Sequence, residues 1–136
     1  MSLTKKLLAL DAAKYKEKAT SEIEVKRLSD MIGEPFLVKV QEVDADKLQE
    51  YQAMLFDKKG KYDLSQTRKV NALICCAGVV EPSLADKDLQ AHFNASSPKE
   101  LAEILFKGID LPMVADEIAR ISNFMPTEEE EEEIKN

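Results

Sequence analysis

Two short stretches in the first third of the chain alternate apolar and polar positions, which is the pattern of half-buried β-strands. They span residues 22–26 and 36–41, and Gly33 and Pro35 mark a turn between them. Residues 28–32 predict one helical turn that ends at Gly33. We therefore expect an antiparallel hairpin with a long loop, covered by helices because two strands alone are unstable. Its apolar face would carry Ile23, Val25, Phe36, Val38 and Val40.

From residue 44 onward, apolar residues recur at helical spacing. Asp44 is placed to cap a helix whose apolar stripe is Leu48, Tyr51 and Leu55, and which ends at residues 58–60, Lys-Lys-Gly.

A second helix is predicted to begin at Asp63, with Gln66 at the position of a capping-box partner. Gly78 ends this helix, and residues 79–83 predict a turn. The stripe of the helix consists of Val70, Leu73, Ile74 and Ala77.

Three further helices are predicted toward the C-terminus. A short one covers residues 86–93, with Leu89 and Phe93 facing inward. The next has the strongest local signal, residues 97–100, which combine a capping serine, a proline at the first helical position and a capping-box glutamate. Its stripe is Leu101, Ile104 and Leu105, and Lys107-Gly108 ends it. Asp110 is expected to cap the last helix, with Val114, Ile118 and Ile121 on one face and Met125-Pro126 at its end.

These elements predict an α+β fold that is mainly helical, with one antiparallel β-hairpin packed on about five helices. Residues 20–126 form the single globular domain in this interpretation. Residues 1–19 are an N-terminal arm or a helix, and residues 127–136 are a disordered acidic C-terminal tail, since like charges repel.

Charge is distributed unevenly along the 136 residues, which have a formal net charge of −7. Six consecutive glutamates lie in the tail, whereas residues 1–19 hold five lysines against one aspartate and one glutamate. Opposite charges at the two ends are compatible with head-to-tail self-association of copies, or with two solvated ends. The acidic balance argues against nucleic acid as a partner.

Targeting and membrane signals are absent from the sequence. No apolar run approaches the roughly 20 residues of a membrane span, so no membrane partner is expected. Asp11 interrupts the apolar stretch near the N-terminus, which argues against a signal peptide. The two cysteines, Cys75 and Cys76, are adjacent and cannot join distant segments, which fits a reducing cytoplasm.

Candidate chemistry is sparse. His92 is the only histidine, so one chain cannot build a histidine-based triad or a multi-histidine metal site. Cys75 and Cys76 lie among apolar residues and are interpreted as buried hydrophobic positions. The four glycines form no phosphate-binding loop. We expect no enzyme activity, no catalytic residue, no metal and no cofactor.

Several segments nevertheless occur in a characteristic order. They are LALDAAK at residues 8–14, IEVKRLS at 23–29, GEPF at 33–36, VEPSL at 80–84, SPKEL at 97–101 and ARISNF at 119–124. This order resembles the XkdN-type tail assembly chaperones of phages and prophage-like elements of Gram-positive bacteria. The resemblance covers residues 8–125 and is carried by caps, turns and apolar positions.

The resemblance implies a non-enzymatic assembly factor in the cytoplasm of the bacterial host. Such chaperones coat the long helical tape-measure protein, keep it soluble, help to recruit tail-tube subunits and are absent from the mature virion. A longer, frameshifted form ending beyond the glutamate run is a further hypothesis. Two other interpretations stay open: a structural connector or tail-completion protein of the phage particle, and an unrelated protein-binding adaptor.

The last helix is the candidate for partner contact, because its apolar stripe lies next to the predicted tail. The alternative is that this stripe closes the core. The candidate partner-binding residues are Val114, Ile118, Ile121 and Phe124.

Overall fold

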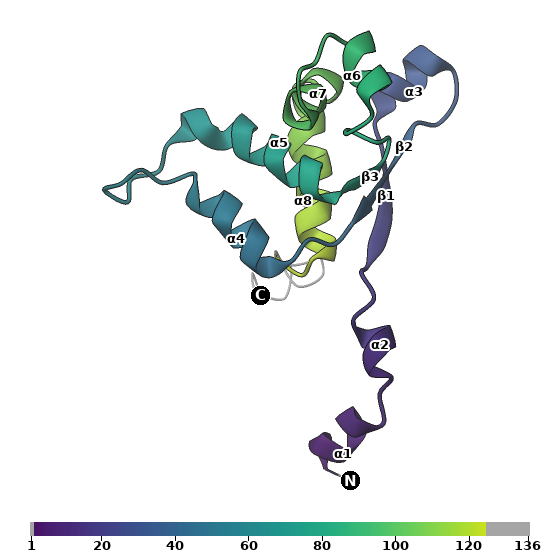
Figure 1. The fold of residues 1–136 in the computed structure, drawn as a ribbon, viewed down its shortest axis with the longest axis vertical. Coiled ribbons are helices and arrows are strands. Elements are labelled where there is room, and N and C mark those ends of the chain that lie inside the picture. Colours follow the sequence, from purple (N-terminus) through teal and green to yellow (C-terminus); the bar gives the residue numbers. More distant parts are fainter. Residues whose placement is uncertain (1, 125–136) are drawn as a thin grey trace, which may run out of the picture.

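A three-stranded antiparallel sheet forms one side of the molecule (Figure 1). The computed structural model describes residues 2–124. Its strands are β1 (Thr20–Glu24), β2 (Leu37–Gln41) and β3 (Val79–Glu81), in the order β1-β2-β3. Along β2, Val38 and Val40 are buried whereas Leu37 and Lys39 are exposed. This confirms the alternation that predicts a hairpin and the α+β, mainly helical fold class.

The turn predicted for residues 79–83 is wrong over its first three residues, which form β3. Val79 pairs with Val40, and Glu81 pairs with Lys39. This strand completes the second edge of β2, so the sheet has one strand more than the expected hairpin.

Val25 is not part of β1, although the alternation places it there. It is the N-cap residue of α3 (Lys26–Ile32), and its side chain is buried in the core. The helical turn expected before Gly33 is confirmed as α3. Gly33 ends this helix with φ +88°, a left-handed conformation that glycine adopts without a steric penalty.

All five helices predicted after residue 44 are present, and a short 3₁₀ helix precedes the second of them. The chain reverses direction in the loop between α4 and α5, and α7 and α8 pack against α5 (Figure 1). The elements are α4 (Ala45–Ala53), η1 (Leu64–Gln66), α5 (Thr67–Gly78), α6 (Lys87–His92), α7 (Pro98–Leu105) and α8 (Asp110–Ile121).

The helix end predicted at residues 58–60 is wrong, because α4 stops at Ala53. The chain instead makes a tight turn in which the Asp57 carboxylate accepts hydrogen bonds from the amides of Lys59 and Lys61, at 2.8 and 2.9 Å. A β-bridge between Phe56 and Tyr62 closes this turn. Asp44 occupies the N-cap position of α4 without a side-chain capping bond.

Two capping predictions fail because the side chains have other partners. Gln66 makes no capping box, and its amide contacts the Ser65 hydroxyl while Asp63 caps η1. Asp110 is the first residue of α8 instead of its cap, and it pairs with Arg27.

The capping serine of α7 is confirmed, since the Ser97 hydroxyl accepts from the Glu100 amide at 3.1 Å. The Glu100 carboxylate accepts from the Ser96 hydroxyl instead of completing the predicted capping box. Phe93, the C-cap residue of α6, is exposed rather than inward. Gln90 is the buried residue, and its side chain donates to the Leu84 carbonyl at 2.8 Å.

The core lies between the sheet and the helices α5, α7 and α8. The closest approach joins α5 to α8, where a Cβ built on Gly78 would lie 2.6 Å from Cγ2 of Ile118. Only glycine fits at this crossing. The largest fully buried side chains include Phe106, Leu48, Leu101, Leu111 and Ile118.

The residues before β1 extend away from this body (Figure 1). They contain α1 (Leu3–Leu8), capped by Ser2, and α2 (Ala12–Tyr15), capped by Asp11. Neither helix has a buried residue. We call residues 2–18 the arm. The predicted acidic tail, residues 127–136, and the stop at residues 125–126 lie outside the described residues.

Candidate functional site

The stripe of α8 that was singled out for partner contact lies in or beside the core. Val114 and Ile118 are fully buried, and Ile121 and Phe124 are half-buried against the core cluster. Burying one such aliphatic side chain, rather than leaving it exposed to water, contributes about 1.5–3 kcal/mol. In this conformation only Ile121 and Phe124 offer surface to a partner, and contact through the stripe stays a prediction.

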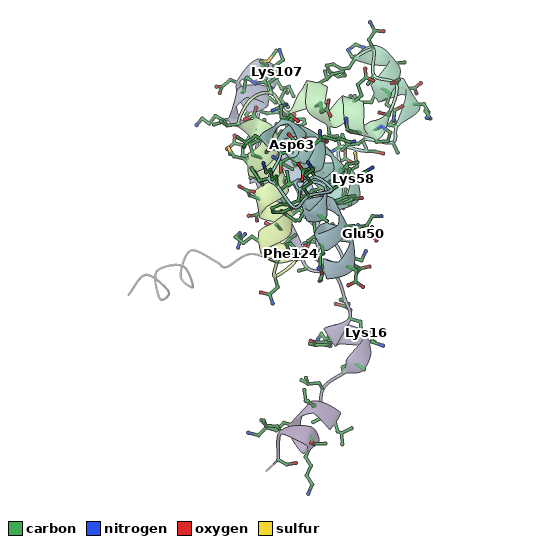
Figure 2. All side chains as sticks on the ribbon, turned by 90° about the vertical axis from the view of Figure 1, so that its left-hand side faces the viewer. Lys16, Glu50, Lys58, Asp63, Lys107 and Phe124 are labelled. Carbon is green, nitrogen blue, oxygen red and sulfur yellow. The ribbon has the colours of Figure 1, made fainter. Side chains whose placement is uncertain are left out.

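Among residues 2–124, the arm carries the densest group of exposed apolar side chains. Its four leucines and its tyrosine are between 55% and 81% exposed. A shallow hollow lies among Leu7, Leu10, Ala12, Tyr15 and Lys16, and the side chains of the arm project from the ribbon around the labelled Lys16 (Figure 2). The spacing of the leucines indicates an amphipathic helix, but the sequence left open whether it docks on the body. The exposed leucines are Leu3, Leu7, Leu8 and Leu10.

A second exposed apolar group lies on the loop between α4 and α5. The rings of Phe56 and Tyr62 meet edge to face, with centroids 5.7 Å apart, and Leu64, the first residue of η1, is exposed. Three lysines lie between the two aromatic residues. We call residues 56–64 the basic tip. The sequence missed it, because the lysines and Gly60 were interpreted as a helix end. Its lysines are Lys58, Lys59 and Lys61.

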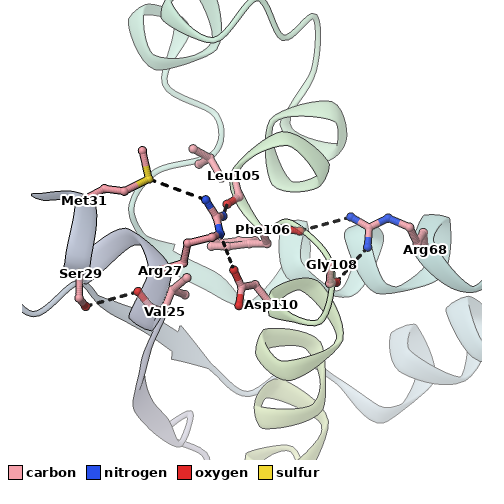
Figure 3. A network of polar contacts seen from close by, with 9 residues as sticks. All are labelled: Val25, Arg27, Ser29, Met31, Arg68, Leu105, Phe106, Gly108 and Asp110. Carbon is pink, nitrogen blue, oxygen red and sulfur yellow. Dashed lines mark hydrogen bonds and ion pairs between the residues drawn. The ribbon is translucent and has the colours of Figure 1, made fainter.

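Two arginines from distant parts of the chain hold the connection between α7 and α8 (Figure 3). Arg27 donates to the Leu105 carbonyl at 3.0 Å and to the Asp110 carboxylate at 3.4 Å. Arg68 donates to the carbonyls of Gly108 at 3.1 Å and Phe106 at 3.3 Å. The carbonyls of Leu105 and Phe106 lie at the end of α7, where a helix leaves carbonyl groups unpaired, and the carbonyl of Gly108 lies in the turn before α8. We therefore assign both arginines a structural role.

The arm and the end of α8 are attached to neighbouring residues. The Ala19 amide donates to the Glu42 carboxylate at 2.7 Å, and the Glu42 amide donates to the Ala19 carbonyl at 2.8 Å. The next amide, that of Val43, donates to the Ser122 hydroxyl at 2.9 Å. In Figures 1 and 2 the arm leaves the body at the same end where α8 stops. The two ends of the described chain thus start from one place.

The candidate reactive groups are placed unfavourably for chemistry. Burial raises the pKa of the Cys75 thiol well above its usual range, and burial also raises the pKa of Cys76. Cys75 is buried and Cys76 half-buried, close to their interpretation as hydrophobic positions. His92 is exposed and packs edge-on against Phe93.

Metal sites and membrane spans were also sought in residues 2–124. No group of three or more histidine, cysteine or acidic residues there could hold a metal ion. None of the helices in this range has both the length and the apolar character that crossing a membrane requires.

Comparison with known proteins identifies the family. A family model described as "Phage XkdN-like tail assembly chaperone protein" matches residues 4–135. The fold is similar to the crystal structure of the protein YqbN, with a TM-score of 0.60 and 17% sequence identity over 86% of this chain and 99% of that one. Comparison with curated proteins gives no match.

The family match extends over nearly the whole chain, including the arm and most of the acidic residues 127–136. It confirms the resemblance carried by the caps, turns and apolar positions. A tail assembly chaperone is a non-enzymatic protein, and its partners are phage tail proteins. The chain belongs to the family of phage XkdN-like tail assembly chaperones.

Proposed function

We propose that this chain binds the tape-measure protein of its phage or prophage, keeps it soluble and assists assembly of the tail tube around it. It acts in the cytoplasm of the bacterial host and is absent from the mature virion. The observation that carries this proposal is the arm, in which four leucines and Tyr15 are exposed without burial against the body.

The arm has the chemistry to shield an amphipathic helix. Burying each leucine against a partner would contribute about 1.5–3 kcal/mol before the cost of ordering and association is subtracted. A helix laid on an apolar surface is a common mode of peptide recognition. Each such contact is of modest strength. When many copies of the chain make it along one long helix, the combined binding is tight, and the copies can be released one after another.

The edge of α8 is the second candidate contact. Ile121 and Phe124 are half-buried at the end of this helix, while Val114 and Ile118 lie beneath them in the core. We expect Phe124→Asp to weaken folding and to leave capture of the tape-measure protein intact, because Phe124 packs against the core. A folded Phe124→Asp protein that has lost capture would instead identify this edge as the binding surface.

The decisive experiment is co-expression with the tape-measure protein of the same phage or prophage, followed by affinity capture and a solubility assay. The native chain should rescue the tape-measure protein from aggregation and co-purify with it. An arm variant should lose both effects, and a tip variant provides the matched control, since it removes exposed apolar side chains elsewhere. The arm variant changes Leu3, Leu7, Leu8 and Leu10 to serine, and the tip variant changes Phe56, Tyr62 and Leu64 to serine.

Two outcomes would contradict the proposal. The first is that the tape-measure protein stays insoluble with the native chain and also with any longer form that the gene encodes. The second is that the chain is found in purified virions, which would favour a connector or tail-completion protein. Capture that survives in the arm variant would retain the function and move the contact to another surface.

A further inference from the structure

Strand β1 lies at an edge of the sheet. Within residues 2–124 it pairs only with β2, in the order β1-β2-β3. The Ala19 carbonyl and the Val25 amide, just outside its two ends, are hydrogen-bonded on the β2 side at 2.8 and 3.1 Å. Because backbone groups alternate in direction along an antiparallel strand, those of Thr20, Glu22 and Glu24 point away from β2. The outer edge of β1 is therefore a template for another strand.

The two faces of β1 differ, which limits how another strand can be added. Three of its side chains are exposed, and the two between them are half-buried on the side of α8. One of these two, Ser21, donates from its hydroxyl to the Glu117 carboxylate of α8 at 2.6 Å. An added strand must match this alternation, because a slip of one residue would turn all its side chains to the wrong face.

Charged residues make this edge complementary to itself. When the β1 strands of two copies run antiparallel with Ser21 at the centre, Glu24 of each copy lies opposite Lys18 of the other. Lys18 is exposed and takes part in no ion pair within the described residues. The Ser29 hydroxyl donates to the Glu24 carboxylate at 2.7 Å, which holds this carboxylate at the end of the strand. Opposite charges that face each other across two strands stabilise the pairing.

Other registers of the same two strands are less favourable. Centring the pair on Glu22 would place the two Glu22 carboxylates opposite each other, and like charges in that position are destabilising. Centring it on Thr20 would pair Glu22 with Lys18 but would bring the ladder into α2. There Lys16 has helical backbone angles, φ −84° and ψ −6°, so the ladder cannot continue. The edge thus favours the register centred on Ser21.

We propose that two copies of the chain join through β1 as an antiparallel pair centred on Ser21, which makes one continuous sheet. The occupant of the edge is a second copy, because its charges match those of the edge in this register. The two-fold axis repeats each contact, so the ion pair between Lys18 and Glu24 occurs at both ends. The contact does not depend on the proposed function, although it would supply that function with two arms in one complex.

The same arrangement brings an exposed apolar patch next to the arm of the second copy. In Figure 1, α3 follows β1 at the end opposite to the arm. Because the second strand runs in the reverse direction, its arm passes Glu24 and continues toward α3 of the first copy. Met31 and Ile32 of α3 are 74% and 54% exposed, and Tyr15 of the arm is 81% exposed. Contact among these side chains would add buried apolar surface to the strand pairing.

The assembly is tested by sedimentation of the isolated full-length protein from about 10 μM to about 1 mM, a range suited to weak interfaces. The native chain should change from monomer to dimer over this range. Lys18→Glu and Glu24→Lys should each lower the dimer affinity about tenfold or more, because each places like charges opposite one another at both ends. Lys59→Glu, in the basic tip, makes the same change of charge elsewhere and should have no effect.

Mixing the two charge variants tests the register. In an equimolar mixture, one copy of each variant restores opposite charges at both ends, so the dimer should return. The double variant Lys18→Glu/Glu24→Lys should dimerise alone for the same reason. A register centred on Thr20 predicts no recovery in the double variant, because Lys18 would then face Glu22. Urea denaturation of each variant checks that its fold is intact.

The backbone of the edge is tested separately. The Glu22 amide should exchange its hydrogen more slowly as the protein concentration is raised, whereas exchange of the Ser21 amide, which points toward β2, should change little. Glu22→Pro removes the outward amide without removing a bond to β2, so the fold should remain and the dimer should be lost.

Four results would overturn the proposal. The first is a native chain that stays monomeric at about 1 mM. The second is a dimer that survives both charge variants and Glu22→Pro, which would place the contact on another surface. The third is a pair of charge variants that do not recover the dimer when mixed. The fourth is a monomeric native chain whose capture of the tape-measure protein is lost in a folded Glu22→Pro variant, which would assign the edge to a strand of that partner. Failed capture with an intact dimer would refute only the proposed function.

Discussion

Replacing Gly78 by alanine should destabilise the protein, because the crossing of α5 and α8 leaves no room for a methyl group. An added Cβ would lie 2.6 Å from Cγ2, 2.7 Å from Cδ1 and 2.8 Å from Cγ1 of Ile118. Ile118 is fully buried and cannot move into solvent. Overpacking of this kind costs about 1–3 kcal/mol. The better helix propensity of alanine returns less than about 1 kcal/mol at this last helical residue.

The assay is urea denaturation of the two single variants and the double variant. Gly78→Ala should lower the free energy of unfolding by about 1–2 kcal/mol with an unchanged m-value. Ile118→Ala should cost about 2–5 kcal/mol by leaving a cavity. In the Ile118→Ala background the alanine at position 78 fills part of that cavity, so it should be neutral or stabilising.

The sign of the coupling decides the outcome. Contacting residues show interaction free energies of about 0.5–3 kcal/mol, whereas independent sites add. Equal destabilisation by Gly78→Ala in both backgrounds, or none in the native background, would refute the close packing of α5 on α8. Such a result would also remove the strongest reason to place the α8 stripe in the core.

Two further tests concern titratable groups. Burial raises the pKa of Glu117, but hydrogen bonds from Arg120 and Ser21 outweigh it and hold the pKa below its usual value of 4.5. The ionised carboxylate therefore stabilises the fold above this pH, and the stabilisation is lost as the pH falls through the lowered pKa. We expect Glu117→Gln to be less stable than the native protein at pH 7. Urea midpoints measured at several pH values should also fall less steeply with acid in this variant than in the native protein. Because burial raises the pKa of Cys75 and Cys76, a thiol reagent should modify Cys75 only after unfolding in urea. Fast labelling of Cys75 in the native protein, followed by mass spectrometry of its peptide, would contradict its burial.

Some local signals in the sequence were sufficient where the partner of a residue lies within one turn, although the capping signals at Asp44 and Gln66 failed at the same range. Gly33 ends α3, and the Ser97 hydroxyl accepts from the Glu100 amide three residues later, both as expected. The alternation of β2 likewise depends only on which face of one strand is buried. Such features follow from backbone geometry and nearest neighbours.

Features that depend on distant partners were not predictable in this way. The three residues of β3 are too few to show a pattern, and they become a strand because Val40 and Lys39 offer a free edge. Asp110 has the residue type of a cap, but Arg27, 83 positions earlier, takes its carboxylate. These choices are made by tertiary contacts, which override local propensity.

The candidate site shows the same division. Helical spacing marks Val114 and Ile118 as a buried face but does not say what covers it, and here the body covers it. The leucines of the arm show the same spacing and are left exposed. Whether an apolar stripe packs or stays open depends on the surface facing it, which no local pattern records.

Ala19 is hydrogen-bonded to Glu42, and Ser122 is hydrogen-bonded to the next residue, Val43, so the two ends of the body lie close together. A short glycine–serine linker could join Phe124 to Ala19, and the chain could be reopened at Gly60 in an exposed turn. Such sites are where circular permutation is usually tolerated. We expect the permuted body to fold with the same sheet order. Such a result would mean that the packing of the side chains determines this fold, whatever the order in which the chain connects its elements.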